Sequence, residues 1–332
     1  MGAKSLYNVV MGVENSALKS EGGKEDYYKV PIDLYRDEEI VEIDLYLYYQ
    51  GQYILCKTKG VKWTTEDDAR MKNFGAVTFF VKFKSPADHS QFLDEKLKNL
   101  LERPNVSVDR KASVLFDVSE PILSKVYASP KAAETMKNAQ GYVKNCIKFM
   151  NEKGSLGEMV KLANRNLNEH THALHVSAYS IALAKRMGAQ SYEDIFALGM
   201  GALLHDVGKS DIDAKILKKP GELDDNEWMV IRQHPEFGYN ILEQRPEVPK
   251  VSRRIVMEHH ERINGRGYPK GIKNIHHFSK VVGIADVFNA LTCETEYSKP
   301  MSPYDALKFM VTHLSLEFDK NLLAGFIEML SE

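Results

Sequence analysis

The sequence predicts a multidomain protein in which a small α+β domain precedes an all-α helical bundle. Apolar and polar residues alternate with a period of two between residues 41 and 48, which is typical of a strand with one buried face. From about Ser113 onward the apolar spacing is helical almost throughout. The 332 residues are enough for two medium domains, so we expect the two patterns to belong to different domains.

The elements of the first domain follow in order along the chain. The alternation from Val41 to Leu47 predicts a strand, and residues 50–52 (Gln-Gly-Gln) interrupt it before the β-prone run 53–56. These two runs predict a hairpin. Residues 77–83 are rich in Val and Phe and predict a further strand, whereas 87–101 change to helical spacing.

Turn signals and composition divide the chain into four predicted parts. Gly and Pro recur between helical segments of roughly 12 to 20 residues in the second half, which suits a compact bundle. The parts are a flexible N-terminus at 1–26, a small α+β regulatory domain at 27–105, a helical connector at 106–152 and the helical domain at 153–332.

The composition excludes several classes of function. A formal net charge of -2 gives no general electrostatic case for binding a nucleic-acid polymer. No apolar run approaches the roughly 18 residues that a membrane span needs, and the first 15 residues do not have the pattern of a secretory signal. The three cysteines are far apart and odd in number, which indicates a reducing, cytoplasmic setting.

Histidines are distributed very unevenly. Of the 11, only His89 lies in the first half, and the other ten fall between His170 and His313. Histidine is the commonest metal ligand among side chains, so we expect the chemistry of this protein in the helical domain.

A His-Asp pair ends an apolar helix in this domain. His205 and Asp206 follow Ala202-Leu203-Leu204, and Gly208 is placed as a helix C-cap. Both side chains can reach one metal where the helix ends. Because a carboxylate has two oxygens, Asp206 could also bridge two ions.

Further candidate ligands interrupt apolar helices downstream and upstream of this pair. Asp286 follows the apolar run 281–285, and a buried carboxylate there needs a cation or strong donors nearby. The full set of candidate metal ligands is His175, His205, Asp206, His234, His259, His260 and Asp286. Five imidazoles and two carboxylates suit transition metals such as iron, manganese, zinc or nickel, and seven ligands fit two ions that share a carboxylate.

Five motifs of this domain resemble the HD-GYP family of the HD phosphohydrolase superfamily, over roughly residues 160 to 330. They are LLHDVGK (203–209), KILKKPGELDDNEW (215–228), RQHPEFGYNIL (232–242), HHERINGRGYPKG (259–271) and ADVFNALT (285–292). The resemblance implies an HD-type helical bundle, a site with two or three metals, and cyclic di-GMP as the usual substrate.

The resemblance implies the following metal ligands. His175, His205, Asp206 and Asp286 would hold one ion, and Asp206, His234, His259 and His260 would hold the second, with Asp206 bridging. A third metal in some members needs a carboxylate four residues before the first histidine, where this chain has Thr171. We therefore expect two transition-metal ions, iron before manganese. The histidines His170, His172, His276, His277 and His313 match no ligand position and are interpreted as surface or local structure.

Other roles are also implied. Lys209 resembles the family's active-site lysine beside the phosphate, which with Asp206 makes the expected catalytic pair, and Glu261 is expected to orient a histidine ligand. The loop that matches the GYP motif is expected to border the substrate cleft and to dock diguanylate cyclase domains. Its residues are Asn264, Gly265, Gly267, Tyr268 and Pro269.

This chain departs from the family pattern at four positions. Asn264 replaces Asp in the GYP motif, Asn289 opens the segment that reads Asp-Ala-Leu-Thr in the family, and Thr295 and Ser298 replace arginines that lie near substrate phosphates. Losing bidentate cationic donors weakens anion binding, so metal binding is better supported than turnover.

Three functions therefore stay open from the sequence. The first is a metal-dependent phosphodiesterase that hydrolyses cyclic di-GMP through a binuclear site. The second is a weakly active or silent signalling module that binds a cyclic dinucleotide or a partner protein. The third is a hydrolase of another nucleotide phosphoester.

Overall fold

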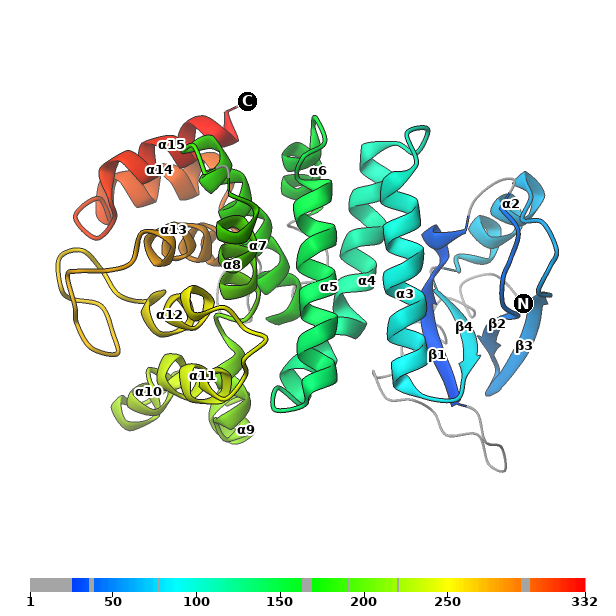
Figure 1. Cartoon of the computed structure of the whole chain (residues 1–332), viewed down its shortest axis with the longest axis horizontal. Coiled ribbons are helices and arrows are strands. Elements are labelled where there is room, and N and C mark those ends of the chain that lie inside the picture. The colour runs from blue at the N-terminus through cyan, green and yellow to red at the C-terminus, as the bar shows by residue number, and fades with distance from the viewer. Residues whose placement is uncertain are drawn as a thin grey trace. The chain divides into compact units, whose positions relative to one another are not determined.

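The structure is a computed structural model that describes residues 26–35, 39–76, 78–162, 169–189, 191–219, 221–293 and 299–331. The chain divides into two compact units, Met1–Val118 and Ser119–Glu332 (Figure 1). The first contains a small antiparallel sheet with helices and the second is helical, which confirms the predicted fold class. The four-part division stays a prediction, and its N-terminal part lies outside the described residues except for Asp26.

The elements of the first unit are these: β1 (Asp26–Pro31), η1 (Ile32–Leu34), β2 (Leu45–Tyr49), β3 (Gln52–Lys57), α2 (Thr65–Phe74), β4 (Thr78–Phe83), α3 (Pro86–Glu102) and the start of α4 (Val108–Ala128). The sheet has the order β1-β4-β2-β3 with antiparallel pairs. Gln50 and Gly51 join β2 to β3 with φ of 50° and 82°, as a two-residue turn with both φ positive requires. The predicted hairpin is therefore confirmed.

The first strand of this hairpin begins later than the alternation predicted. Val41 and Leu45 are both fully buried, but β2 starts only at Leu45, where the register with β3 is irregular. Before that point the Val41 N–H donates to Val61 O at 3.0 Å, and the Lys59 N–H donates to Asp44 Oδ1 at 2.7 Å. Of the alternating apolar residues only Val41 and Leu45 are buried, whereas Ile43 and Leu47 are half-buried. The alternation therefore predicts part of the buried face but not which backbone groups pair.

Three elements of this unit were not predicted, namely β1, the short η1 and α2. Only Asp67 and Met71 of α2 are buried, so the helix has little apolar periodicity to detect. Its signal is instead the capping box at its start, where the Thr64 side chain accepts from the Asp67 N–H and the Asp67 carboxylate accepts from the Thr64 N–H.

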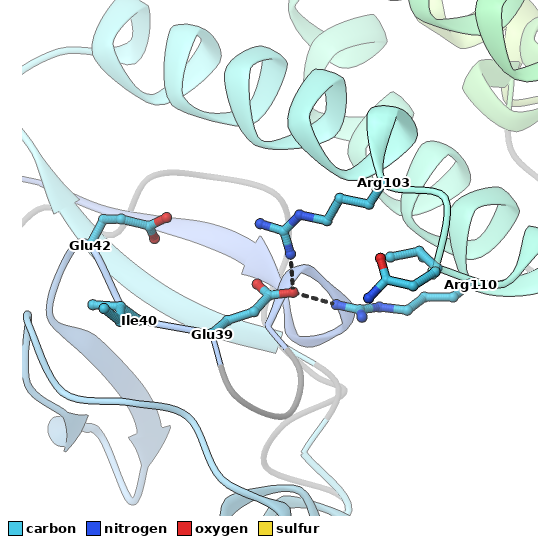
Figure 2. A pocket seen from close by; sticks show the side chains of 7 residues that line it. Glu39, Ile40, Glu42, Arg103 and Arg110 are labelled. Atoms are coloured by element: carbon cyan, nitrogen blue, oxygen red, sulfur yellow. Dashed lines mark hydrogen bonds and ion pairs between the residues drawn. The ribbon is translucent and has the colours of Figure 1, made fainter.

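A cluster of charges fixes the corner between α3 and α4 (Figure 2). Arg103 Nη1 donates to Glu39 Oε1 at 2.6 Å, and Arg110 Nη2 reaches the same oxygen at 3.3 Å. Arg110 also donates to the Asp33 carbonyl at 3.1 and 3.2 Å. These contacts border a cavity of about 590 Å³ and tie the segment before β2 to both helices.

The second unit continues α4 and contains the following elements: α5 (Ala133–Phe149), α6 (Ser155–Leu162), α7 (Glu169–Arg186), α8 (Tyr192–Leu203), η2 (Val207–Asp211), α9 (Ala214–Leu217), α10 (Asp225–Ile231), α11 (His234–Glu243), α12 (Lys250–Glu258), α13 (His277–Thr292), α14 (Pro303–His313) and α15 (Lys320–Leu330). Among the described residues, no helix has the length and apolarity that crossing a membrane requires.

The core of this unit lies around α7 and α8. Helix α7 packs against α8, α13 and α15, whereas α8 also packs against α5 and α12 (Figure 1). The rings of Tyr179, Phe288 and Phe326 contact one another with centroid distances of 5.1 to 6.2 Å. These three helices, α7, α13 and α15, thereby form a rigid frame for polar residues placed on α7 and α13.

Gly208 has a different role from the predicted helix cap. Helix α8 ends at Leu203 with Leu204 as its C-cap, and Gly208 lies in η2. A Cβ on Gly208 would lie 2.0 Å from the His234 carbonyl oxygen and 2.4 Å from the Gly238 nitrogen. Glycine is therefore needed because η2 approaches the backbone of α11 closely.

We expect Gly208→Ala to destabilise the protein by about 1–3 kcal/mol or more, because the new methyl group would clash with backbone and must push α11 away. Gly157→Ala is the matched control. Gly157 lies in α6 with nothing within 4 Å of the added Cβ, and Ala there should be neutral or stabilising by up to about 1 kcal/mol. Urea unfolding of both variants measures the difference, and equal stabilities would contradict this account of Gly208.

Candidate metal centre

Polar residues from four parts of the helical unit converge at one place. His205 and Asp206 lie in the turn between α8 and η2, His234 begins α11, His259 and His260 follow α12, and Asp286 lies on α13. All are buried except His260, which is partly buried. The structure thus brings together six of the seven predicted ligands.

The first group of donors contains Asp206, His234, His259 and His260. One ligand atom of each lies within 4.8 Å of those of the others. His234 Nε2 is 3.2 Å from both Asp206 Oδ1 and His259 Nε2, and His259 Nε2 is 4.0 Å from Asp206 Oδ1. We call these four residues group A.

The second group contains His172, His205 and Asp286, and we call it group B. Asp286 Oδ1 is 3.1 Å from His172 Nε2 and 3.9 Å from His205 Nε2. Asp206 also faces this group, because its Oδ2 lies 3.2 Å from His205 Nε2. The two oxygens of Asp206 therefore point to different groups.

The structure corrects the sequence analysis at one histidine of α7. His172 lies in group B, whereas His175 lies in neither group. His175 is fully buried with its ring 6.1 Å from that of Tyr179, and burial lowers its pKa to about 3, so it is a neutral core residue. Both histidines lie on the same side of one helix, since three residues turn the chain by about 300°. Spacing alone could not separate them.

Three of the histidines share one hydrogen-bonding pattern. The Nδ1 of each lies at 2.7 to 2.8 Å from the carbonyl oxygen three residues earlier: His205 on Ala202, His234 on Ile231 and His259 on Val256. A carbonyl accepts only, so Nδ1 carries a proton, and the Nε2 of each ring presents a lone pair to the centre when the ring is neutral. This is the tautomer that a metal ligand needs.

These tautomers place two hydrogen-bond acceptors opposite each other. His234 and His259 both present an acceptor Nε2, and these atoms are only 3.2 Å apart in a buried place. Two acceptors cannot hydrogen-bond to each other, so the pair needs a cation or a donor between them. Adjacent ligands of one ion with bonds of about 2.1 Å lie roughly 3.0–3.4 Å apart, so the residues present fit a metal ion.

The carboxylates of the centre are held ionised. Burial by itself would raise the pKa of Asp206, but Lys209 and His205 outweigh this effect and keep that pKa well below its usual range. The pKa of Asp286 is likewise lowered, because hydrogen bonding to His172 and the nearby His260 outweigh burial. Two buried negative charges therefore lie among the nitrogen donors of both groups, which favours cations there.

Lys209 and Asn289 complete the surroundings. Lys209 Nζ lies 2.7 Å from Asp206 Oδ2, with about a quarter of its side chain exposed at the edge of the site. Asn289 is fully buried, and its Oδ1 lies 2.7 Å from His172 Nδ1. His172 therefore differs from the other three histidines, because a side chain and not a backbone carbonyl orients its ring.

Glu261 does not orient a histidine as expected. Its carboxylate accepts from the backbone N–H groups of Lys270 at 2.8 Å and Ile272 at 3.0 Å, so it closes the loop that follows His260. These two amides belong to no helix or strand, so they need an acceptor, and the buried carboxylate of Glu261 supplies it.

The loop itself lies against the donor groups. The Tyr268 ring stacks on His260 with centroids 4.5 Å apart, and its N–H donates to the His260 carbonyl. A Cβ on Gly267 would lie 2.4 Å from the Arg262 nitrogen, so only glycine fits there. Asn264 Oδ1 accepts from the Arg266 N–H at 2.9 Å, and Gly265 has a φ of 77°. Pro269 follows through a cis peptide bond.

Sequence reasoning missed Glu258. This buried carboxylate accepts from the His276 N–H at 2.8 Å and from Ser279 Oγ at 3.0 Å, and it also bonds to Arg254. It joins the end of α12, next to His259, to the start of α13, which carries Asp286. The signal available was a carboxylate directly before a predicted ligand pair.

The other histidines whose side chains are described lie outside both donor groups. His276 is the N-cap of α13, where its Nδ1 accepts from the Phe278 N–H, and the ring of His313 stacks on Phe309. His277 begins α13 on the exposed side. The side chain of His170 and residues Thr295 and Ser298 lie outside the described residues.

The donor groups lie in the part of the chain that matches a known family. The family described as "HD domain" matches residues 154–322, which is half of the chain and contains both donor groups. The chain belongs to the HD-GYP family. It is 30% identical over 176 residues to "Cyclic di-GMP phosphodiesterase PA4108" of Pseudomonas aeruginosa, covering 52% of this chain and 42% of that protein.

The name of a second relative refers to a different cyclic dinucleotide. The chain is 32% identical over 162 residues to "3'3'-cGAMP-specific phosphodiesterase 3" of Vibrio cholerae, covering 48% of this chain and 35% of that protein. The matched part thus spans about two fifths of these curated relatives. In fold, the chain is similar to Bd1817, an HDG"Y"P protein from Bdellovibrio bacteriovorus, with a TM-score of 0.67, 17% identity, and coverage of 92% of this chain and 100% of that one.

Replacing His172 and His175 separately tests which histidine of α7 is a metal ligand. We expect His172→Ala to lower the metal content of the purified protein by about one ion per chain, because group B loses a donor. His175→Leu should retain the metal content of the wild type. Elemental analysis of both variants measures this, and the reverse pattern would restore His175 as the ligand.

His175 also makes the stability depend on pH. Its pKa is near 3 in the folded protein and about 6.5 when unfolded, so the unfolded state binds more protons and stability falls as the pH drops from about 6.5 towards 3. We expect His175→Leu to reduce this slope by up to about 1.4 kcal/mol per pH unit. Urea unfolding at pH 6.5 and 5 would show it, and parallel curves for wild type and variant would disprove it.

Proposed function

We propose that this chain is a metal-dependent phosphodiesterase that hydrolyses cyclic di-GMP at a binuclear metal centre. The observation that supports it is the pair of donor groups that share Asp206, with Oδ1 facing group A and Oδ2 facing group B. The names of the relatives, which act on cyclic di-GMP or 3'3'-cGAMP, support a cyclic dinucleotide as the substrate class.

The proposed ligand sets follow the two groups. His172, His205 and Asp286 would hold one ion, His234, His259 and His260 would hold the other, and Asp206 would bridge them. Nitrogen and oxygen donors without thiolate suit iron, and manganese is the second choice. The residue four positions before His172 is Asn168, an amide and not a carboxylate, so the sequence supports two ions and not three.

The chain's own residues would position the phosphate and its charge. When bound, the two ions supply Lewis acidity at the phosphate and lower the pKa of a water molecule. Lys209 would place an ammonium beside the phosphate and neutralise charge that develops there, which is electrostatic stabilisation and not covalent catalysis. Tyr268 covers His260 and limits the access of bulk water on that side.

A second function is favoured by the departures from the family pattern. With Asn264 and Asn289 in place of Asp, and Thr295 and Ser298 in place of Arg, the chain would bind a cyclic dinucleotide or a partner protein and turn over slowly or not at all. A third, hydrolysis of 3'3'-cGAMP or another phosphoester in place of cyclic di-GMP, is favoured by the name of the Vibrio relative.

The roles of the first unit and of the loop stay predictions. We propose that the α+β unit is regulatory, and that the loop with Tyr268 docks diguanylate cyclase domains. The three cysteines, all within the described residues, form no disulfide, which supports the cytoplasm as the proposed compartment.

Metal-loaded protein should hydrolyse cyclic di-GMP, and Asp206→Asn should reduce kcat at least about 10³-fold, because one uncharged amide cannot bridge two cations. The matched control is Asp211→Asn, an exposed carboxylate of the neighbouring η2, which should leave kcat within about twofold. Product formation is followed by chromatography after loading with Fe²⁺ or Mn²⁺. Full activity of Asp206→Asn would reject the binuclear mechanism, whereas binding without product in the wild type would favour the signalling module.

A further inference from the structure

One face of α10 and its C-cap carries two exposed large apolar side chains between two charged ones. Asp225, Trp228, Met229 and Arg232 recur at the spacing i, i+3, i+4 and i+7, so they share one side of the helix, and they line a hollow of about 330 Å³. Trp228 is 46% exposed and Met229 is 57% exposed. We call these four residues the α10 face.

The side chains of the α10 face are available to a ligand. Within the described part of the chain, neither the indole N–H of Trp228 nor the carboxylate of Asp225 takes part in a hydrogen bond or ion pair, and the guanidinium of Arg232 makes only a ring contact. The other tryptophan of the protein, Trp63, is fully buried and bonded to Asp68. Among the described residues, folding therefore does not account for an exposed tryptophan beside an arginine that makes only a ring contact.

The α10 face is continuous with the metal centre. The Arg232 guanidinium lies 5.7 Å from the centroid of the Tyr268 ring, and that ring stacks on His260 of group A at 4.5 Å. Arg232 is also two residues before His234 of the same group. A ligand whose phosphate lay at the centre would thus extend past Tyr268 towards Arg232, at one end of the α10 face.

The chemistry of this face matches a purine base. An indole ring stacks on the π-face of any base, and a neighbouring thioether adds polarizable contact. A guanidinium can donate two bonds to the O6 and N7 acceptors of guanine, whereas adenine presents a donor at the corresponding exocyclic position.

We propose that Trp228, Met229 and Arg232 form a subsite that binds one purine base of the cyclic dinucleotide, with guanine preferred over adenine. This subsite rests on the proposed function, because it needs the phosphate of the same ligand at the metal centre. It makes the α10 face a determinant of substrate recognition and not a site of chemistry.

Kinetics with purine and pyrimidine substrates test the subsite. We expect Trp228→Ala to raise KM for cyclic di-GMP by about tenfold to hundredfold with kcat changed less than about threefold, because stacking acts on binding. The preference for cyclic di-GMP over cyclic di-UMP should fall by about tenfold. Trp228→Phe should recover most of the loss, and Arg232→Gln should reduce the preference for cyclic di-GMP over cyclic di-AMP.

Tyr304→Ala is the matched control, since Tyr304 is an aromatic residue that is 73% exposed on α14. It should leave KM for cyclic di-GMP within about twofold. An unchanged KM and purine preference in Trp228→Ala would overturn the subsite, even if the wild type is active, and would leave the α10 face as a surface for a partner helix.

Direct binding separates failure of the subsite from failure of the proposed function. Because Trp63 is buried, quenching of the exposed tryptophan on addition of cyclic di-GMP reports Trp228. Quenching, together with at least tenfold weaker binding to Trp228→Ala, supports the subsite even if no dinucleotide is hydrolysed. Equal affinity of wild type and variant, or no binding of cyclic di-GMP at millimolar concentration, overturns it.

Discussion

The arrangement of the helical unit depends on one buried carboxylate. Asp206 is almost fully buried, and its oxygens face two separate clusters of nitrogen donors. An ionised carboxylate in such a place is costly unless cations surround it, so its environment has to be built from both sides. Helix α8 therefore stops at Leu203, which leaves His205 and Asp206 in a turn where both side chains can reach the same centre.

The surrounding fold holds the donors in place through the backbone. Three imidazoles are oriented by carbonyl oxygens of their own helical turns, which cannot be altered by a side-chain substitution. Gly208 lets η2 touch α11, and Glu258 joins the end of α12 to the start of α13. Each contact ties together two elements that carry donors, so the centre is preorganised before any ion binds.

In the proposed function, chemistry and recognition are separated in this unit. The donor groups are buried and Tyr268 covers His260, whereas Trp228 and Met229 of the α10 face are exposed. A substrate with two bases and two phosphates would use both regions at once, with a phosphate at the donor groups and a base on Trp228 and Arg232.

Local patterns in the sequence were enough for the β2–β3 hairpin, the helical bundle and six of the seven donor residues, because turn residues and apolar periodicity act over a few positions. They could not separate His172 from His175, which differ by less than one helical turn on the same side of α7. Periodicity identifies the face of a helix, but only packing decides which residue of that face meets Asp286. The same holds for Glu261 and Gly208, whose partners are backbone atoms of distant segments, and for α2, which buries too little apolar surface to leave a pattern.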